Sequence, residues 1–281
     1  MTQPQHPRAL LAQRGLRPKK RFGQNFLMEA RAAQRIARLA ASRDGGDAVP
    51  RVLEIGAGTG ALTLALLAEG ADVTAIEIDP DLVAILRSRA DLEAATIVEA
   101  DALAFDYHAY ARGGAWSVAG NLPYNVATPI VTSLVEMEDG PSSLTVMVQK
   151  DVADRFAAAP GTPAYGSLSV AVQYAMRVER AFTLAPGAFY PPPKVHSTVV
   201  RLVRRETPAV RPRDLALFRK VVRAAFAYRR KTLANGLALA LGAQRASVAS
   251  AIAACGFAPE ERGERLSLDD FARLADELAG R

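Results

Sequence analysis

Short apolar runs alternate with amphipathic stretches along the first part of the chain. The pattern predicts a helix over 28–41, with Ile36 and Leu39 facing inward. Strands are then expected at 51–55, 73–78, 96–98, 115–119 and 144–149, alternating with helices at 61–69, 80–90, 126–137 and 150–158. Because short apolar strands that alternate with helices are typical of a mostly parallel sheet covered on both faces, the chain is expected to have an α/β fold.

The pattern changes after residue 160. A helix is predicted near 166–175, followed by extended segments near 177–184 and 196–204 that a Pro-rich loop connects. Two consecutive strands without an intervening helix predict an antiparallel edge to the sheet. From about residue 208 the chain is helical again, and one helix is expected to carry Phe218, Val222, Ala225, Phe226, Leu233 and Leu237 on one side. We therefore predict a basic arm and cofactor-covering segment at 1–27, a main domain at 28–207 and a helical domain at 208–281.

The charge of the chain is concentrated in two basic blocks. The 281 residues are half apolar, as in an ordinary globular protein, and carry a net charge of +6. Residues 1–40 hold nine Lys/Arg and one acid, and residues 201–231 hold eleven Lys/Arg and two acids. Two basic blocks on an otherwise acidic chain favour contact with a polyanion at two places, although solvated charge runs are an alternative.

Several functional classes are disfavoured by the rest of the composition. One cysteine, Cys255, excludes an internal disulfide and a cysteine-based zinc site, and the three histidines have no metal-ligand spacing, so no metal is expected. The basic N-terminus lacks an apolar signal region, and no run of 18 apolar residues occurs. We expect a cytoplasmic protein that is not associated with a membrane.

A glycine-rich turn follows the first predicted strand of the sheet, in Glu54-Ile55-Gly56-Ala57-Gly58-Thr59-Gly60. Glycines allow positive φ angles and let a ligand approach the backbone closely. A strand, glycine turn and helix are typical of sites for nucleoside-bearing cofactors, including both nicotinamide dinucleotides and S-adenosylmethionine. The turn alone does not choose between them.

Acidic residues follow the next two predicted strands. Glu77 ends the second strand and is placed to accept hydrogen bonds from ribose hydroxyls, and Asp101 follows the third strand and is placed to accept one from an adenine amine. Because the carboxyl ends of parallel strands meet at one edge of a sheet, these residues and the glycine turn are expected to line one crevice. Helix capping or a solvated loop is the alternative for each acid by itself.

The segment Asn121-Leu122-Pro123-Tyr124, after the fourth strand of the sheet, indicates the chemistry. An exocyclic amine of a nucleobase is a poor nucleophile, because its lone pair is delocalised into the ring. The Asn121 side-chain oxygen and the Leu122 carbonyl are candidate acceptors for its two N–H groups, Pro123 fixes the turn, and Tyr124 offers a ring for stacking on the base. These residues favour an enzyme that methylates a nucleobase amine. A Pro turn without a ligand would explain only Pro123.

An ordered set of segments resembles the KsgA-type (RsmA) small-subunit ribosomal RNA adenine N6,N6-dimethyltransferases. The matching segments are 20–27 (Lys-Arg-Phe-Gly-Gln-Asn-Phe-Leu), 54–63, 77–79, 101–103, 121–125, 148–150, 165–166, 189–197, 225–226 and 229–233. The resemblance implies a Rossmann-like class I methyltransferase fold with a mostly parallel seven-stranded sheet, an antiparallel edge and a small helical C-terminal domain. It also implies S-adenosylmethionine as the cofactor.

The resemblance assigns roles to individual residues. Asn25, Leu27, Gly56, Gly58, Glu77, Asp101 and Asn121 would bind the cofactor. The catalytic residues would be Asn121, Leu122, Pro123 and Tyr124, together with Phe189, which would sandwich the flipped adenine with Tyr124. RNA backbone would be bound by Arg223, Arg229, Arg230 and Lys231. Core packing is the alternative for Phe189.

The resemblance implies dimethylation of two adjacent adenines near the 3′ end of 16S ribosomal RNA, by a monomer acting late in small-subunit biogenesis. A large-subunit adenine methyltransferase of the antibiotic-resistance type is one alternative, although its loop tends to read Asn-Ile-Pro-Tyr. Another is a non-catalytic RNA-binding assembly factor, which the intact Asn121 and cofactor residues disfavour. A nicotinamide-dependent oxidoreductase is disfavoured by the Asn-Leu-Pro-Tyr loop and the basic blocks.

Overall fold

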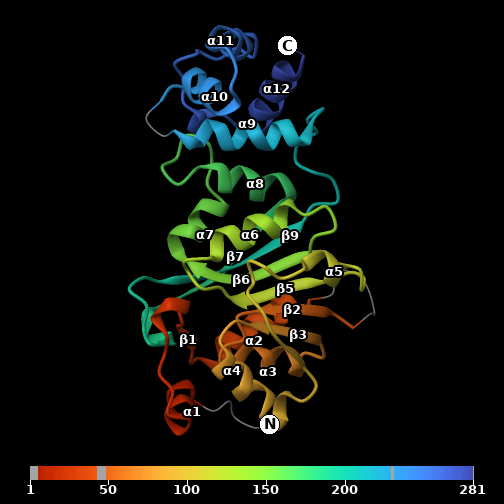
Figure 1. Ribbon diagram of the computed structural model, residues 1–281, viewed down its shortest axis with the longest axis vertical. Coiled ribbons are helices and arrows are strands. Elements are labelled where there is room, and N and C mark those ends of the chain that lie inside the picture. Colours follow the sequence, from red (N-terminus) through yellow and green to blue (C-terminus); the bar gives the residue numbers. More distant parts are fainter. Residues whose placement is uncertain (1–5, 43–48, 229–230, 281) are drawn as a thin grey trace. The chain divides into compact units, whose positions relative to one another are not determined.

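The structure is a computed structural model that describes residues 6–42, 49–228 and 231–280. Its chain packs into two compact units (Figure 1). The first comprises Met1–Ala153 and Val178–Arg204, and the second comprises Asp154–Arg177 and Arg205–Arg281. Packing therefore groups residues 154–177 with the C-terminal helices. The functional boundaries after residues 27 and 207 stay predictions.

Within the described residues, seven strands form one sheet in the order β4-β3-β2-β5-β6-β9-β7. Its strands are β2 (Arg51–Ile55), β3 (Asp72–Glu77), β4 (Thr96–Glu99), β5 (Ser117–Asn121), β6 (Ser143–Gln149), β7 (Met176–Leu184) and β9 (Ser197–Arg204). The first five of these pair in parallel, and β9 pairs antiparallel with β6. The predicted mostly parallel sheet with an antiparallel edge is confirmed, and β9 lies between β6 and the edge strand β7.

The sheet has its topological switch point at β2, because β2 pairs with β3 on one side and with β5 on the other. The apolar residues of β2, β3, β5, β6 and β9 are buried, and several of them share one core with α2 (Ala30–Ala40), α3 (Ala61–Ala68) and α4 (Pro80–Arg87). The helices that follow along the chain are α5 (Tyr107–Ala111), α6 (Ala127–Glu136) and α7 (Lys150–Phe156). Ile36 on α2 is fully buried, as expected, and Leu39 packs at the margin of the same core. Ligands bind at the switch point of such sheets, beyond the carboxyl ends of the strands.

The N-terminal arm, which was expected to be basic and partly ordered, contains three regular elements within the described residues. It contains α1 (Pro7–Gln13), the short 3-10 helix η1 (Lys20–Phe22) and β1 (Phe26–Leu27). Strand β1 pairs antiparallel with β8 (Phe189–Tyr190), so that Leu27 lies opposite Phe189. This two-stranded sheet attaches the arm to the Pro-rich loop that the sequence left as a connection.

The second unit is helical and has a core of its own. It contains α8 (Ser167–Ala175), α9 (Leu215–Ala227), α10 (Leu233–Leu241), α11 (Arg245–Ala254) and α12 (Leu268–Ala279). The expected single helix is wrong, because α9 ends at Ala227 and α10 begins at Leu233. The expected apolar residues do share one core: Phe218, Val222, Leu233 and Leu237 are buried with Phe271, and Ala225 and Phe226 pack against them. None of the helices in the described part of the chain has the length and hydrophobicity needed to cross a membrane.

Candidate active site

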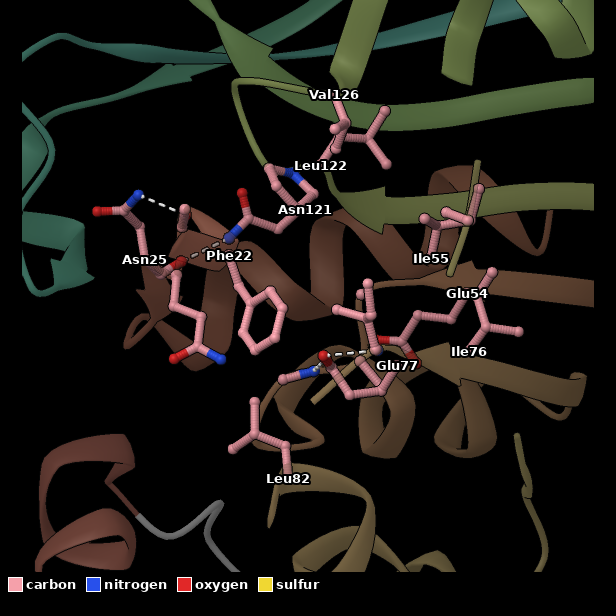
Figure 2. Close-up of a pocket in the computed structure, with 18 of the residues that line it drawn as sticks. Phe22, Asn25, Glu54, Ile55, Ile76, Glu77, Leu82, Asn121, Leu122 and Val126 are labelled. Atoms are coloured by element: carbon pink, nitrogen blue, oxygen red, sulfur yellow. Dashed lines mark hydrogen bonds between the residues drawn. The ribbon is translucent and has the colours of Figure 1, made fainter. Parts of the chain in front are cut away.

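A pocket of about 320 Å³ lies in the first unit at the switch point of the sheet (Figure 2). Its walls come from the N-terminal arm and from the carboxyl ends of β2, β3, β4 and β5, because residues 21–27, 54–59, 76–78, 100–103 and 121–126 all line it. The structure thus brings together Asn25, Leu27, Gly56, Gly58, Glu77, Asp101 and Asn121, the residues that the sequence assigned to the cofactor.

At Gly58 the glycine turn lies close against the N-terminal arm. Gly58 has a φ of 58°, and a Cβ on it would lie 3.1 Å from the ring of Phe26. The backbone N–H of Gly58 donates to the Glu77 carboxylate across 2.9 Å. The absence of a Cβ therefore lets the arm close over the turn while the turn holds an acid of the next strand.

Glu77 is buried, and its carboxylate also accepts hydrogen bonds from the N–H groups of Ile78, at 2.9 Å, and Asp79, at 3.0 Å. Burial raises the pKa of Glu77, and the three backbone donors offset part of this rise. A carboxylate offers about four acceptor positions, and backbone N–H groups occupy three of them, so one further hydrogen bond from a ligand hydroxyl fits here. This arrangement suits a ribose.

Asp101 lies at a more open edge of the same pocket. One of its oxygens accepts a hydrogen bond from Leu103 N at 2.8 Å, which fixes the turn after β4. Leu103 and Ile78 line the pocket beside it and are unusually exposed for apolar residues, at 53% and 39%. Exposed apolar side chains next to a hydrogen-bond acceptor suit a flat base with an amine. The pocket as a whole therefore fits an adenosyl group.

The Asn-Leu-Pro-Tyr segment is held in a defined conformation at the end of β5. Asn121 donates its side-chain Nδ2 to the backbone carbonyl of Asn25 across 2.7 Å (Figure 2). A carbonyl cannot donate, so this bond assigns the nitrogen to Asn25 and leaves Oδ1 as the acceptor. The N–H of Leu122 donates to the Met147 carbonyl at 3.1 Å, which fixes the next peptide. The sequence did not show that the arm orients the Asn121 amide.

Tyr124 also lines the pocket and is half-buried. Its hydroxyl forms a hydrogen bond of 2.7 Å with the Ser197 hydroxyl on β9. Burial raises the pKa of Tyr124, so the phenol stays neutral at physiological pH. The ring is fixed in place as a surface on which a base can stack.

Phe189 is not brought to the pocket lining. Its side chain is 1% exposed, and it packs in the core of the first unit with Leu27 and Val199. This surrounding matches the core-packing alternative. Stacking of Phe189 on the adenine stays a prediction, and it requires the ring to leave this core.

Asp79 is a functional candidate that the sequence analysis did not single out. Its side chain is 2% exposed and accepts hydrogen bonds from Lys19 Nζ at 2.6 Å and from Gln24 Nε2 at 2.8 Å. Gln24 Oε1 in turn accepts from the N–H of Lys19 at 2.7 Å. Burial alone would raise the pKa of Asp79, but the bonds from Lys19 and Gln24 hold it below its ordinary value. We call this closed set of contacts the arm latch, because it ties residues 19–24 to the turn before α4.

Glu54 is a second residue that the pattern did not single out beyond its place in the glycine turn. Its side chain is 1% exposed at the wall of the pocket, and among the described residues its Oε2 has no hydrogen-bond partner. Burial, with the charge of Glu77 nearby, raises the pKa of Glu54 to about 7. Its buried, partly unsatisfied carboxyl would be stabilised by a donor entering the pocket.

The predicted RNA-binding residues belong to the second unit. Arg223 on α9 and Lys231 before α10 are both exposed. Arg229 and Arg230 lie outside the described residues. In the described part of the chain, no group of three or more His, Cys, Asp or Glu side chains is arranged to hold a metal ion.

The sheet order and the pocket at its switch point define a class I S-adenosylmethionine-dependent methyltransferase fold. The family model for ribosomal RNA adenine dimethylases matches residues 15–279. The chain therefore belongs to the ribosomal RNA adenine dimethylase family, whose methyl donor is S-adenosylmethionine.

Two relatives are both named ribosomal RNA small subunit methyltransferase A. The relative from Geobacter metallireducens is 43% identical over 266 residues, which cover 93% of this chain and 95% of the relative. The relative from Pseudomonas aeruginosa is 44% identical over 265 residues, which cover 94% of this chain and 95% of the relative.

Solved structures agree with the fold. A dimethyladenosine transferase from Plasmodium falciparum has a TM-score of 0.68 and 23% identity over 86% of this chain and 94% of its own. The 23S rRNA methyltransferase ErmE has a TM-score of 0.65 and 26% identity over 91% of this chain and 100% of its own.

Proposed function

We propose that this enzyme dimethylates the N6 amines of two adjacent adenines near the 3′ end of 16S ribosomal RNA in the small ribosomal subunit. The names of the relatives from Geobacter metallireducens and Pseudomonas aeruginosa support the small subunit as the substrate. The observation that carries the site assignment is the bond from Asn121 Nδ2 to the Asn25 carbonyl, which leaves Oδ1 as a preset acceptor.

Gly56, Gly58, Glu77 and Asp101 would hold the cofactor, with Asn25 and Leu27 covering it from the arm. When bound, S-adenosylmethionine supplies a methyl group that its sulfonium has already activated. The chain therefore has to bind and orient the target amine rather than generate a strong nucleophile. This requirement fits a pocket wall built from amide, carbonyl and aromatic groups.

Asn121 Oδ1 and the carbonyl of Leu122 would accept hydrogen bonds from the two N–H groups of the adenine amine. Acceptors outside the ring plane would turn the nitrogen lone pair out of conjugation with the ring and make it available to the methyl donor. Methyl transfer would form the nitrogen–carbon bond as the carbon–sulfur bond breaks, and the resulting ammonium would lose a proton to solvent. The monomethylated amine would keep one N–H for these acceptors, and a second transfer would give dimethyladenine. Pro123 would fix the turn, and Tyr124 would stack on the base.

The exposed Arg223 and Lys231 of the second unit would bind RNA backbone, with Arg229 and Arg230 as further candidates outside the described residues. Phosphate contacts of this kind give affinity and register rather than sequence choice. We further propose that the enzyme acts in the cytoplasm during late small-subunit assembly, because its proposed substrate is an assembling ribosomal subunit, and that it acts as a monomer.

The test is transfer of radiolabelled methyl groups to small subunits from cells that lack this activity, with large subunits as a parallel substrate. We expect label only in the small subunit, recovered as dimethyladenine. Label in the large subunit would instead assign the enzyme to the antibiotic-resistance type. RNA binding without label in either subunit would indicate an assembly factor and contradict the proposed reaction.

A further inference from the structure

The three consecutive cations at 19–21 have different surroundings. Lys19 is half-buried and bonds to Asp79 and Asp81, each at 2.6 Å. Lys20 and Arg21 are exposed on the short helix η1, and no ion pair joins either of them to another residue in the described ranges. The fold uses the first cation and leaves the next two exposed.

The η1 turn lies directly against the loop that is proposed to hold the target base. Gly23, which ends the turn, has a φ of 63°, and a Cβ on it would lie 3.0 Å from Asn125 Oδ1 and 3.5 Å from Pro123 Cβ. Asn125 is itself exposed and lines the pocket. The mouth of the pocket is therefore formed where the η1 turn and this loop meet.

Arg21 lines the pocket and is exposed, which places it at that mouth. Its guanidinium carbon lies 4.6 Å from the centroid of the Phe22 ring. Phe22 points into the pocket (Figure 2). A guanidinium over an aromatic face is held by a cation–π interaction, while the N–H groups in its plane remain able to donate.

A nucleotide whose base enters this pocket keeps its two flanking phosphates outside, because removing a phosphate from water is costly unless cations compensate for it. Arginine and lysine are the common ligands of such phosphates. We propose that Lys20 and Arg21 bind the RNA phosphates that flank the flipped adenine. This inference rests on the proposed function, and it separates these two residues from Lys19, which belongs to the arm latch.

The test compares steady-state methyl transfer to unmethylated small subunits by the wild type and by Lys20→Gln, Arg21→Gln and Arg21→Lys. Loss of one phosphate contact should raise the KM for subunits about 5-fold. It should also make the negative slope of log(kcat/KM) against log salt concentration shallower by about 1. The KM for S-adenosylmethionine and kcat should stay within about 2-fold in the glutamine variants, and Arg21→Lys should recover most of the affinity for subunits.

Two control variants make the comparison specific. Arg112→Gln removes an exposed arginine that does not line the pocket, and it should leave the KM for subunits and the salt slope unchanged. Lys19→Met should raise the KM for S-adenosylmethionine and leave the salt slope unchanged, because Lys19 is bound within the fold.

Three results would overturn the inference. The first is a KM for subunits and a salt slope that stay at wild-type values in both glutamine variants. The second is the same change in Arg112→Gln as in Arg21→Gln. The third is a higher KM for S-adenosylmethionine in Arg21→Gln, which would assign this guanidinium to the cofactor carboxylate. Absence of methyl transfer by the wild type would contradict the proposed function itself, and this outcome is distinct from the other three.

Discussion

Replacing Asp79 with Asn removes the charge of the arm latch with little change in shape. Asn is as good an N-cap as Asp, so the bond from Asp81 N that begins α4 can remain. One of the two oxygens becomes an NH₂ group, which cannot accept from Lys19 or from Gln24. Gln24 cannot rotate its amide to compensate, because its Oε1 would then no longer accept the hydrogen bond from the Lys19 N–H. At least one contact of the latch is therefore lost.

The magnitude follows from the lost contact. A hydrogen bond to a charged group contributes about 1.5–3 kcal/mol. Lys19 is 27% exposed and keeps Asp81 as a partner, so solvent screening reduces this to about 1–2 kcal/mol. Residues 21–27 line the pocket, and a cofactor would have to order them again on binding. Affinity for S-adenosylmethionine should then fall about 5- to 30-fold.

Calorimetric titration of the wild type and of Asp79→Asn with S-adenosylmethionine measures this loss. The matched control is Asp81→Asn, which removes the 48% exposed partner of Lys19 and should change the affinity less than about 2-fold. Equal affinities for the wild type and Asp79→Asn, with both proteins folded, would refute a role of the latch in holding the cofactor.

The same variant predicts a pH dependence of stability. The folded protein holds the pKa of Asp79 below its ordinary value, so the carboxylate stabilises the fold above the unfolded pKa of about 4. This stabilisation is lost as the pH falls through the lower folded pKa. The melting temperature of the wild type should therefore exceed that of Asp79→Asn at pH 7, and the two should converge in acid. A constant difference would contradict this sign.

Three further changes test the pocket. Glu54→Gln should stabilise the apoprotein by up to ~3 kcal/mol at pH 8 and little at pH 4. The reason is that the folded pKa of Glu54 is about 7, so ionisation of the buried carboxyl destabilises the fold as the pH rises. An equal shift in melting temperature at both pH values would contradict this. Gly23→Ala and Gly15→Ala both place alanine at a φ near 65°, which should cost about 1–2 kcal/mol of stability in each variant. Only Gly23→Ala presses on Asn125, so only this variant should also slow methyl transfer. Equal rates for the two variants would refute the role of that contact. Tyr124→Phe keeps the stacking surface and should retain most of the activity. Tyr124→Ala should lose about 1–3 kcal/mol of base binding, measured as a higher KM for subunits. Equal losses in the two variants would show that the hydroxyl, not the ring, matters.

The sheet could be predicted because most of its strands are apolar runs that can be recognised from neighbouring residues in the sequence. Strand β6 was expected at 144–149 and is observed at Ser143–Gln149, with almost every residue buried. The pairing of β1 with β8 could not be predicted in this way. Each of these strands has two residues, and their pairing depends on contacts between segments far apart in the chain.

The pocket could be predicted in part, because strand order alone brings Gly56, Glu77 and Asn121 to one edge of the sheet. The arm latch could not, because Lys19 lies within a basic run that looks solvated and its partner Asp79 lies in another element. Whether a cation in such a run binds the fold or solvent depends on three-dimensional packing. Phe189 shows the same limit, because an aromatic residue beside prolines has the same local pattern whether it faces a pocket or a core.

If Asn121 holds the adenine amine for methyl transfer, Asn121→Ala should yield little N6,N6-dimethyladenosine. Mass spectrometry of nucleosides from 16S RNA would follow incubation of unmethylated small subunits with S-adenosylmethionine and either enzyme. Dimethyladenosine should be abundant with the wild type and at least about 100-fold lower in the variant, because a preset hydrogen-bonding group at the reacting centre is removed. RNA binding should persist. Dimethyladenosine formed at the wild-type rate by Asn121→Ala would contradict this role of Asn121.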